Sequence, residues 1–288
     1  MKTLLNPGNP LASKRRSGAM LAVGLALMLA LDVATAGVAT TKHNLGSTGT
    51  AGNNKFGGTT EVCVFCHTPH GANVSIAVPA PLWNRNFTTA TAYTTYASLG
   101  TTTLDGKVAT TGSVSIACLS CHDGTQAMDI MINTPGSGTD PAGFPATGAW
   151  SGTNQTAGKI TGAYTNLGVD LTNDHPIGIQ YWGGGVKFDA QNGPCNDPDF
   201  KLAPNLQYSG AGTSTMWWVE TNGNTTRELT DLPLYTRSDT TTYDGLLLTG
   251  GAQPYVECVS CHDPHNNNTT FLRVSNNGSV ICLACHTK

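Results

Sequence analysis

The stretch Cys63–His70, CVFCHTPH, contains two cysteines and two histidines. Its first part, C-x-x-C-H, occurs again at Cys118–His122 (CLSCH), Cys258–His262 (CVSCH) and Cys282–His286 (CLACH). The stretch Cys258–His265, CVSCHDPH, repeats the whole pattern with its second histidine. These motifs decide the fold, because a large apolar group held by them would take the place of an ordinary core.

The spacing C-x-x-C-H is the attachment site of a c-type haem, with two thiols on the porphyrin edge and the histidine on the iron. Two other interpretations explain part of the pattern. Eight cysteines in an exported protein are typical of a disulfide framework, and C-x-x-C pairs also occur in four-ligand zinc sites. Neither accounts for a histidine directly after every second cysteine. We therefore expect four covalent c-type haems, attached through Cys63, Cys66, Cys118, Cys121, Cys258, Cys261, Cys282 and Cys285.

The eight histidines match the eight axial positions of four haem irons. Four of them lie inside the motifs and are the predicted proximal ligands: His67, His122, His262 and His286. The predicted distal ligands are His43, His70, His175 and His265. A surface or packing role is the alternative for each distal histidine. Met128 and Met131, close after Cys121, leave open a His/Met haem, since methionine is also a haem ligand.

Two histidines separated by only three residues cannot reach opposite faces of one porphyrin. His67 and His70, with Pro69 between them, are therefore expected to bind different haems, and the rigid proline suits such a bend. The same reasoning separates His262 from His265. The resulting pairing prediction joins His67 with His43, His122 with His70, His262 with His175, and His286 with His265.

The N-terminal residues 1–36 have the features of a secretory signal peptide. A basic group, Lys14–Arg16, precedes the apolar run Ala19–Leu31 and the small residues Ala34–Ala36. The apolar run is too short to span a bilayer comfortably. A twin-arginine signal is an alternative for this segment. We expect an exported protein without a membrane span, extracellular or on the cell surface, or alternatively in the periplasm.

Composition predicts a mostly irregular fold with short helices, few short strands and haems as the core. Only 11% of residues are charged, against about 25% in typical domains, and Gly, Thr and Asn replace them. The formal net charge of −3 gives no basic face for nucleic acid, which excludes that class of partner. Strands are predicted at Thr215–Glu220 and Gly245–Gly250. Trp217 and Trp218 are expected to cover a haem or a sheet face; a binding platform is the alternative.

The motifs divide residues 37–288, a single tetrahaem unit, into three parts. Haems 1 and 2 belong to residues 37–135, a loop-rich insert covers 136–245, and haems 3 and 4 belong to 246–288. The two ends resemble each other as weak repeats. Cys195 lies in the insert, as an unpaired thiol or as half of an intermolecular disulfide.

The segments KHNL, VCVFCHTPHG, PLWNRN, DHPIG and CVSCHDPH resemble multihaem cytochromes with doubled C-x-x-C-H motifs. Four motifs, a signal peptide and this length are similar to the outer-surface tetrahaem cytochromes whose subunits polymerise into conducting filaments. The resemblance implies a head-to-tail homopolymer that passes electrons to partner cytochromes or an extracellular acceptor. It also implies that one iron takes its second histidine from the neighbouring subunit. His43 and His70 are the candidates for this role, offered to the haem at His286.

Electron transfer without catalysis is the function that these features favour. No catalytic residue is predicted, because every axial position has a candidate histidine. A multihaem reductase, which usually keeps one iron position open, is one alternative. A monomeric periplasmic shuttle has the same chemistry as a filament and is the other.

Overall fold

The computed structural model describes residues 37–74, 80–87, 93–135, 150–174, 176–183, 197–201, 206–209, 216–237 and 253–287. By its internal contacts Gly37–Lys288 forms one unit, distinct from Met1–Ala36. His175, Cys195 and the predicted strand Gly245–Gly250 lie outside the described residues. Within the described part of the chain, no helix has the length and apolar character needed to cross a membrane.

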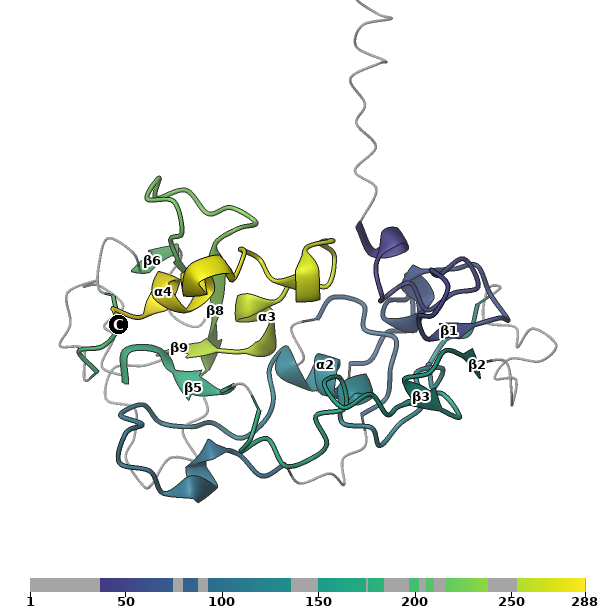
Figure 1. Ribbon diagram of the computed structural model, residues 1–288, viewed down its shortest axis with the longest axis horizontal. Helices are drawn as coiled ribbons and strands as arrows, with labels where there is room; N and C mark the ends of the chain where they lie inside the picture. Colours follow the sequence, from purple (N-terminus) through teal and green to yellow (C-terminus); the bar gives the residue numbers. More distant parts are fainter. Residues whose placement is uncertain are drawn as a thin grey trace, which may run out of the picture. The chain divides into compact units, whose positions relative to one another are not determined.

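Each C-x-x-C pair lies on its own short helical segment (Figure 1). These segments are the 3-10 turn η2 (Cys63–Phe65, followed by Cys66) and the helices α2 (Ser115–His122), α3 (Cys258–Cys261) and α4 (Val280–Cys285). Residues three apart on a helix lie on one side, so both thiols of a pair face the same way. The backbone becomes extended at His262 and His286, directly after α3 and α4. The helix end thus turns each of these imidazoles away from the helix axis.

Further turns of 3-10 helix lie outside these segments. They are η1 (Gly37–Thr40), η3 (Tyr96–Leu99), η4 (Tyr181–Gly183), η6 (Thr269–Phe271) and η7 (Asn277–Ser279). η3 lies in the Thr-rich stretch 88–111, whose described part is otherwise turns and irregular chain. No described helix exceeds the eight residues of α2. Short turns of this kind fit a chain with few strong helix formers.

An antiparallel sheet of five strands occupies the later part of the chain, in the order β5-β9-β8-β7-β6. Its strands are β5 (Ile179–Gln180), β6 (Leu206–Ser209), β7 (Met216–Val219), β8 (Leu232–Arg237) and β9 (Gln253–Val256). Tyr235 pairs with Tyr255, and Trp217 with Leu234. α3 follows β9 directly and packs against β8 (Figure 1). The sheet thereby holds the third C-x-x-C-H motif in place.

Two two-stranded ladders lie elsewhere in the chain. β1 (Lys55–Phe56) pairs with β2 (Trp150–Ser151), and β3 (Gln155–Thr156) pairs with β4 (Lys159–Ile160). The β1–β2 pairing joins the segment before the first motif to the first described residues of the insert. β7 coincides with the strand predicted at Thr215–Glu220.

Two apolar clusters pack against the attachment cysteines. The first contains Phe56, Phe65 and Met128, with Cys66 and Cys121 at its margin. The second is built around the sheet and the last helix, with Cys261 and Cys285 at its margin; it includes Tyr181, Trp182, Trp217, Val219, Leu232, Leu234, Ile281 and Ala284. Each cluster therefore lies against two neighbouring C-x-x-C-H motifs. Trp217 and Trp218 are both buried.

Candidate haem sites

All eight motif cysteines are free thiols. The disulfide framework considered as an alternative is therefore not formed among them. Burial raises the pKa of Cys66 to about 12, of Cys285 to about 12, and of Cys261 to about 11. These thiols are consequently protonated near pH 7, and the apolar surroundings that cause the shift suit a porphyrin edge.

A backbone segment runs antiparallel to the first motif and fixes its histidine. The His67 Nδ1–H donates to the Pro81 carbonyl at 2.8 Å. The Thr68 N–H donates to the Leu82 carbonyl at 2.9 Å, and the Asn84 N–H donates to the Cys66 carbonyl at 2.8 Å. We call Pro81–Asn84 the first cradle segment.

The third motif has the same arrangement, made by Thr270–Arg273, the second cradle segment. The His262 Nδ1–H donates to the Thr270 carbonyl at 2.8 Å. The Asp263 N–H donates to the Phe271 carbonyl at 2.8 Å, and the Arg273 N–H donates to the Cys261 carbonyl at 2.9 Å. The hydrogen bonds of the two halves correspond one to one, so the weak sequence repeat is a structural repeat at these positions.

These hydrogen bonds set the tautomer of the proximal imidazoles. His122 makes the same type of bond as His67 and His262: its Nδ1–H donates to the Thr165 carbonyl at 2.7 Å. An imidazole that donates through Nδ1 presents the Nε2 lone pair, and metal-bound histidines are usually held by such a bond. The three side chains are therefore prepared as metal ligands. Sequence reasoning missed the cradle segments, because any residue can supply a carbonyl acceptor.

Part of the second cradle segment has left-handed backbone. Thr270 and Phe271 have φ values of 55° and 60°, a conformation that costs energy for residues with a side chain and clusters at functional sites. These two residues make contacts with candidate ligands: the Thr270 carbonyl accepts the His262 Nδ1–H, and the Phe271 ring stacks on His43 at 4.3 Å between centroids.

Two pairs of imidazoles face each other at nearly the same spacing. The ring centroids of His43 and His122 lie 6.2 Å apart, and those of His67 and His265 lie 6.1 Å apart. A metal between two imidazole nitrogens, with bonds of about 2.0 Å and ring centres about 1.1 Å beyond the nitrogens, would separate the centroids by roughly 6.2 Å. Both centroid distances are therefore compatible with two axial ligands of one iron.

These contacts favour a different pairing from the one expected from the sequence. His43 lies opposite His122 and not opposite His67, and His265 lies opposite His67 and not opposite His286. The prediction chose partners by their order along the chain, whereas the fold brings His265, which follows the third motif, beside the first one. The proposed separation of His262 from His265 agrees with this arrangement, since His265 serves another site.

The surroundings keep the facing imidazoles neutral. Burial, followed by the neighbouring His122, lowers the pKa of His43 to about 4. Burial also lowers the pKa of His122, against the opposing effect of its bond to Thr165. Neutral imidazole is the form that binds a metal, so both side chains are ready for ligation at neutral pH.

Of the other histidines, the distal candidate His70 and the proximal candidate His286 are not members of these two pairs. His70 is exposed, and its carbonyl accepts hydrogen bonds from Thr68 Oγ1 at 2.8 Å and Asn133 Nδ2 at 2.9 Å. His286 packs its ring on Phe200 at 4.3 Å. His175 lies outside the described residues. The described part of the chain thus contains two facing imidazole pairs, not four.

Residues 253–288 match the Doubled CXXCH motif family. The matched segment contains the third and fourth motifs. A search of curated proteins gave no match. The doubled CXXCH motif is consistent with a multihaem c-type cytochrome, a class that binds haem covalently, transfers electrons and is typically exported.

Contacts between α2 and α3 connect the doubled CXXCH motif to the second motif of the chain. The Ser115 hydroxyl donates to Glu257 Oε2 at 2.6 Å and accepts the Cys258 N–H at 3.0 Å. Arg237 forms an ion pair with Glu257 at 2.8 Å. The thiols of Cys118 and Cys258 lie in hydrogen-bond contact, which raises the pKa of Cys118 and lowers that of Cys258. The second and third attachment sites are therefore neighbours.

The other metal-ligand alternatives find less support in the described residues. Met128 is buried in the cluster with Phe56 and Phe65, as expected for a packing role, while His122 faces His43. No group of three or more His, Cys, Asp or Glu side chains gathers as a metal site within the described ranges. The two imidazole pairs are thus the candidate ligand arrangement among the described residues.

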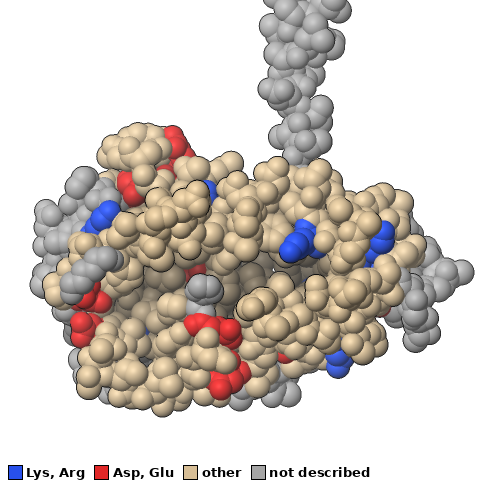
Figure 2. Space-filling model, viewed as in Figure 1, with Lys and Arg blue, Asp and Glu red and all other residues tan. Residues whose placement is uncertain are grey.

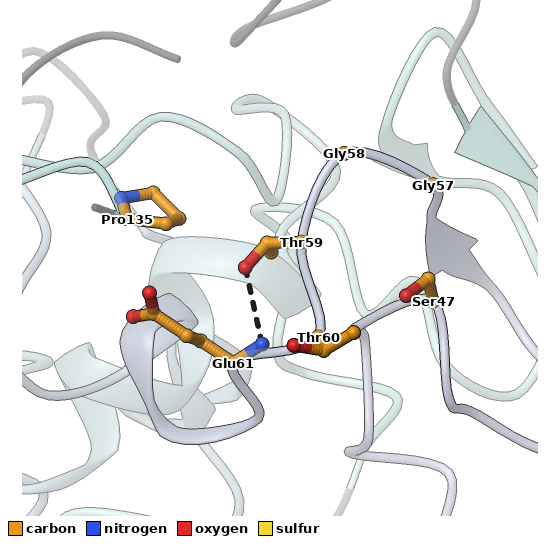
Figure 3. Close-up of a pocket in the computed structure, with 7 residues that line it drawn as sticks. All are labelled: Ser47, Gly57, Gly58, Thr59, Thr60, Glu61 and Pro135. Carbon is orange, nitrogen blue, oxygen red and sulfur yellow. Dashed lines mark hydrogen bonds between the residues drawn. The ribbon is translucent and has the colours of Figure 1, made fainter.

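An open pocket lies just before the first motif (Figure 3). Its lining is polar or small, and the Glu61 N–H donates to Thr59 Oγ1 at 3.0 Å; the lining residues are Ser47, Gly57, Gly58, Thr59, Thr60, Glu61 and Pro135. It contains no histidine or cysteine. The pocket is therefore separate from the imidazole pairs.

Proposed function

We propose that this protein is a tetrahaem electron carrier in which histidine occupies both axial positions of every iron. The observation that carries the proposal is the pair of imidazole spacings, 6.2 Å for His43 and His122 and 6.1 Å for His67 and His265. Haem supplies an iron that exchanges single electrons. Two imidazoles on one iron leave no position for a small ligand, which favours electron transfer over catalysis.

The chain's own residues perform the positioning. The cradle carbonyls of Pro81 and Thr270 hold His67 and His262 in one tautomer. The Ser115–Glu257 hydrogen bond keeps the second and third attachment sites together. Since electron transfer needs closely spaced rings, this contact supports a continuous path between the two halves of the chain.

We further propose that the subunits polymerise into extracellular filaments, with His70 as the ligand that crosses the interface. Of the two candidates, His43 faces His122 within its own chain, whereas His70 is exposed. His70 would serve the His286 iron of the next subunit, and His175 would serve the iron at His262. The face in Figure 2 shows few charged side chains, with lysine and arginine scattered. A surface with little charge opposes subunit association only weakly.

Three measurements on the purified, exported protein test these proposals. Intact mass should show four added haems, and electron paramagnetic resonance should show only low-spin iron. Electron microscopy should show fibres, and His70→Ala should yield single subunits with the same haem count. A high-spin iron in the unmodified filament would overturn the axial assignment. Unpolymerised wild-type protein with four low-spin haems would instead support a monomeric shuttle.

A further inference from the structure

We infer that Arg85 is a potential-setting residue, whose buried charge raises the reduction potentials of the haems attached at the first and second motifs. This inference rests on the proposed function, because it assumes that haems occupy these motifs. It goes beyond that function because it predicts that the haems at the first two motifs and those at the last two have different reduction potentials.

Arg85 is completely buried, with 0% of its surface exposed. Its Nε donates to Ser120 Oγ at 3.1 Å, and its Nη1 donates to the Met128 carbonyl at 2.7 Å. Its Nη2 donates to the carbonyls of Ser120 and Ala127, both at 2.9 Å. These four bonds use four of the five N–H groups of the guanidinium. The side chain is thus immobile and nearly saturated.

The charge of Arg85 has no acidic counterpart among the described residues. All its bonds go to carbonyl and hydroxyl oxygens, and no described carboxylate lies within ion-pair distance. Burying an unpaired charge is costly, and the four dipoles only partly offset this cost. An electrostatic effect of this charge on the neighbouring haem sites would explain why Arg85 is buried despite the cost.

The contacts of this side chain place its charge beside two attachment motifs. Arg85 donates to both the hydroxyl and the carbonyl of Ser120, which lies between Cys118 and Cys121 in the second motif. The N–H of the preceding residue, Asn84, donates to the carbonyl of Cys66 in the first motif at 2.8 Å. One cation therefore acts at two haem sites at once.

The second half of the chain offers a contrast. Arg273 lies beside Cys261, and its Nε donates to the Val259 carbonyl at 2.9 Å. Unlike Arg85, it has an acidic partner, because Asp263 Oδ2 lies 3.8 Å from its Nη1. Asp263 belongs to the stretch CHDPH, whereas the first half has Thr68 in the corresponding stretch CHTPH. The balanced charge at Arg273 should have less effect on the nearby haem.

The direction of the effect follows from electrostatics. Reduction removes one positive charge from an iron, so a nearby cation stabilises the reduced form and raises the potential. The effect is large in a buried site, because the effective dielectric constant is low, and salt screens it little. The first two haems should therefore accept electrons more readily than they would without Arg85.

The test is a redox titration of the purified holoprotein, followed by nuclear magnetic resonance signals that report each haem separately. Arg85→Gln should lower the potentials of the haems at His67 and His122. The expected shift of each ferric–ferrous equilibrium is about tenfold, which is about 59 mV for a one-electron couple. Arg85→Lys, which keeps the charge, should restore most of the shift, and high salt should not abolish it.

Asp263→Asn provides a second test if Arg85→Gln does not fold. This variant leaves the Arg273 charge unbalanced and should raise the potential of the haem at His262. Unchanged potentials in a folded Arg85→Gln protein with four low-spin haems would overturn the inference. A shift in Arg85→Lys as large as the shift in Arg85→Gln would also overturn it, because lysine keeps the charge. Absence of attached haem in the wild-type protein would instead refute the proposed function.

Discussion

The imidazoles of His67 and His265 face each other with centroids 6.1 Å apart and planes inclined by 21°, although they belong to opposite halves of the sequence. The stretch Cys258–His265 therefore contributes one histidine to each of two candidate sites. Its His262 belongs to its own C-x-x-C pair, and under the proposed ligation its His265 would complete the site of the first motif. This sharing links the halves of the chain at the site itself.

Loss of His265 should open one axial position. In His265→Ala, we expect one haem to become high-spin and the reduced protein to bind carbon monoxide, with the other haems unaffected. Absorption spectra and electron paramagnetic resonance measure both changes. Intact mass should stay that of four haems, because attachment depends on the cysteines. An entirely low-spin variant would contradict the assignment.

Before haem is bound, the stability of the folded chain should fall as the pH falls from 6.5 towards 4, because His43 is then not held by an iron. The pKa of His43 is about 4 in the folded chain against 6.5 when exposed. Within this window the unfolded chain binds more protons, so acidification lowers the free energy of unfolding, by up to about 3 kcal/mol. Urea unfolding across this pH range measures the effect. His43→Ala should lose much of this pH dependence, and an unchanged slope would contradict the prediction.

The motifs could be found from the sequence because they depend on local spacing, whereas the distal histidines were chosen only because eight histidines match eight axial positions. The sequence was not sufficient for the pairing, since His43 and His265 reach their sites through the path of the whole chain. Most of the sheet was also missed. β8 and β9 contain Pro233 and Pro254, and proline within a segment argues against a central strand.

Phe271 should stabilise His43 through ring stacking. Phe271→Ala removes the 4.3 Å contact and should lower the free energy of unfolding by about 1 kcal/mol, the usual contribution of an aromatic pair beyond its buried area. Chemical denaturation measures this loss. Phe271→Leu keeps apolar bulk without the stacked ring and should fall between wild type and alanine. Equal stability of all three proteins would show that the stack contributes nothing.

Ser115 should be a stability determinant because it serves two buried partners. Ser115→Ala leaves the Glu257 carboxylate and the Cys258 N–H each without one hydrogen bond. An unsatisfied buried polar group costs about 1–3 kcal/mol. Denaturation midpoints of the holoprotein measure the change, with the exposed Ser151→Ala as the matched control, expected within about 0.5 kcal/mol of wild type. Identical midpoints for both variants would contradict the prediction.

The shared position of His265 has a consequence for biosynthesis. Polypeptides are made from the N-terminus, so the first motif leaves the ribosome long before its opposing imidazole exists. A truncated product could acquire its first porphyrin but could not complete that iron's coordination. Under the proposed ligation, a fully coordinated iron at His67 would show that synthesis has reached His265, so spectra of the iron would distinguish a full-length chain from a truncated one.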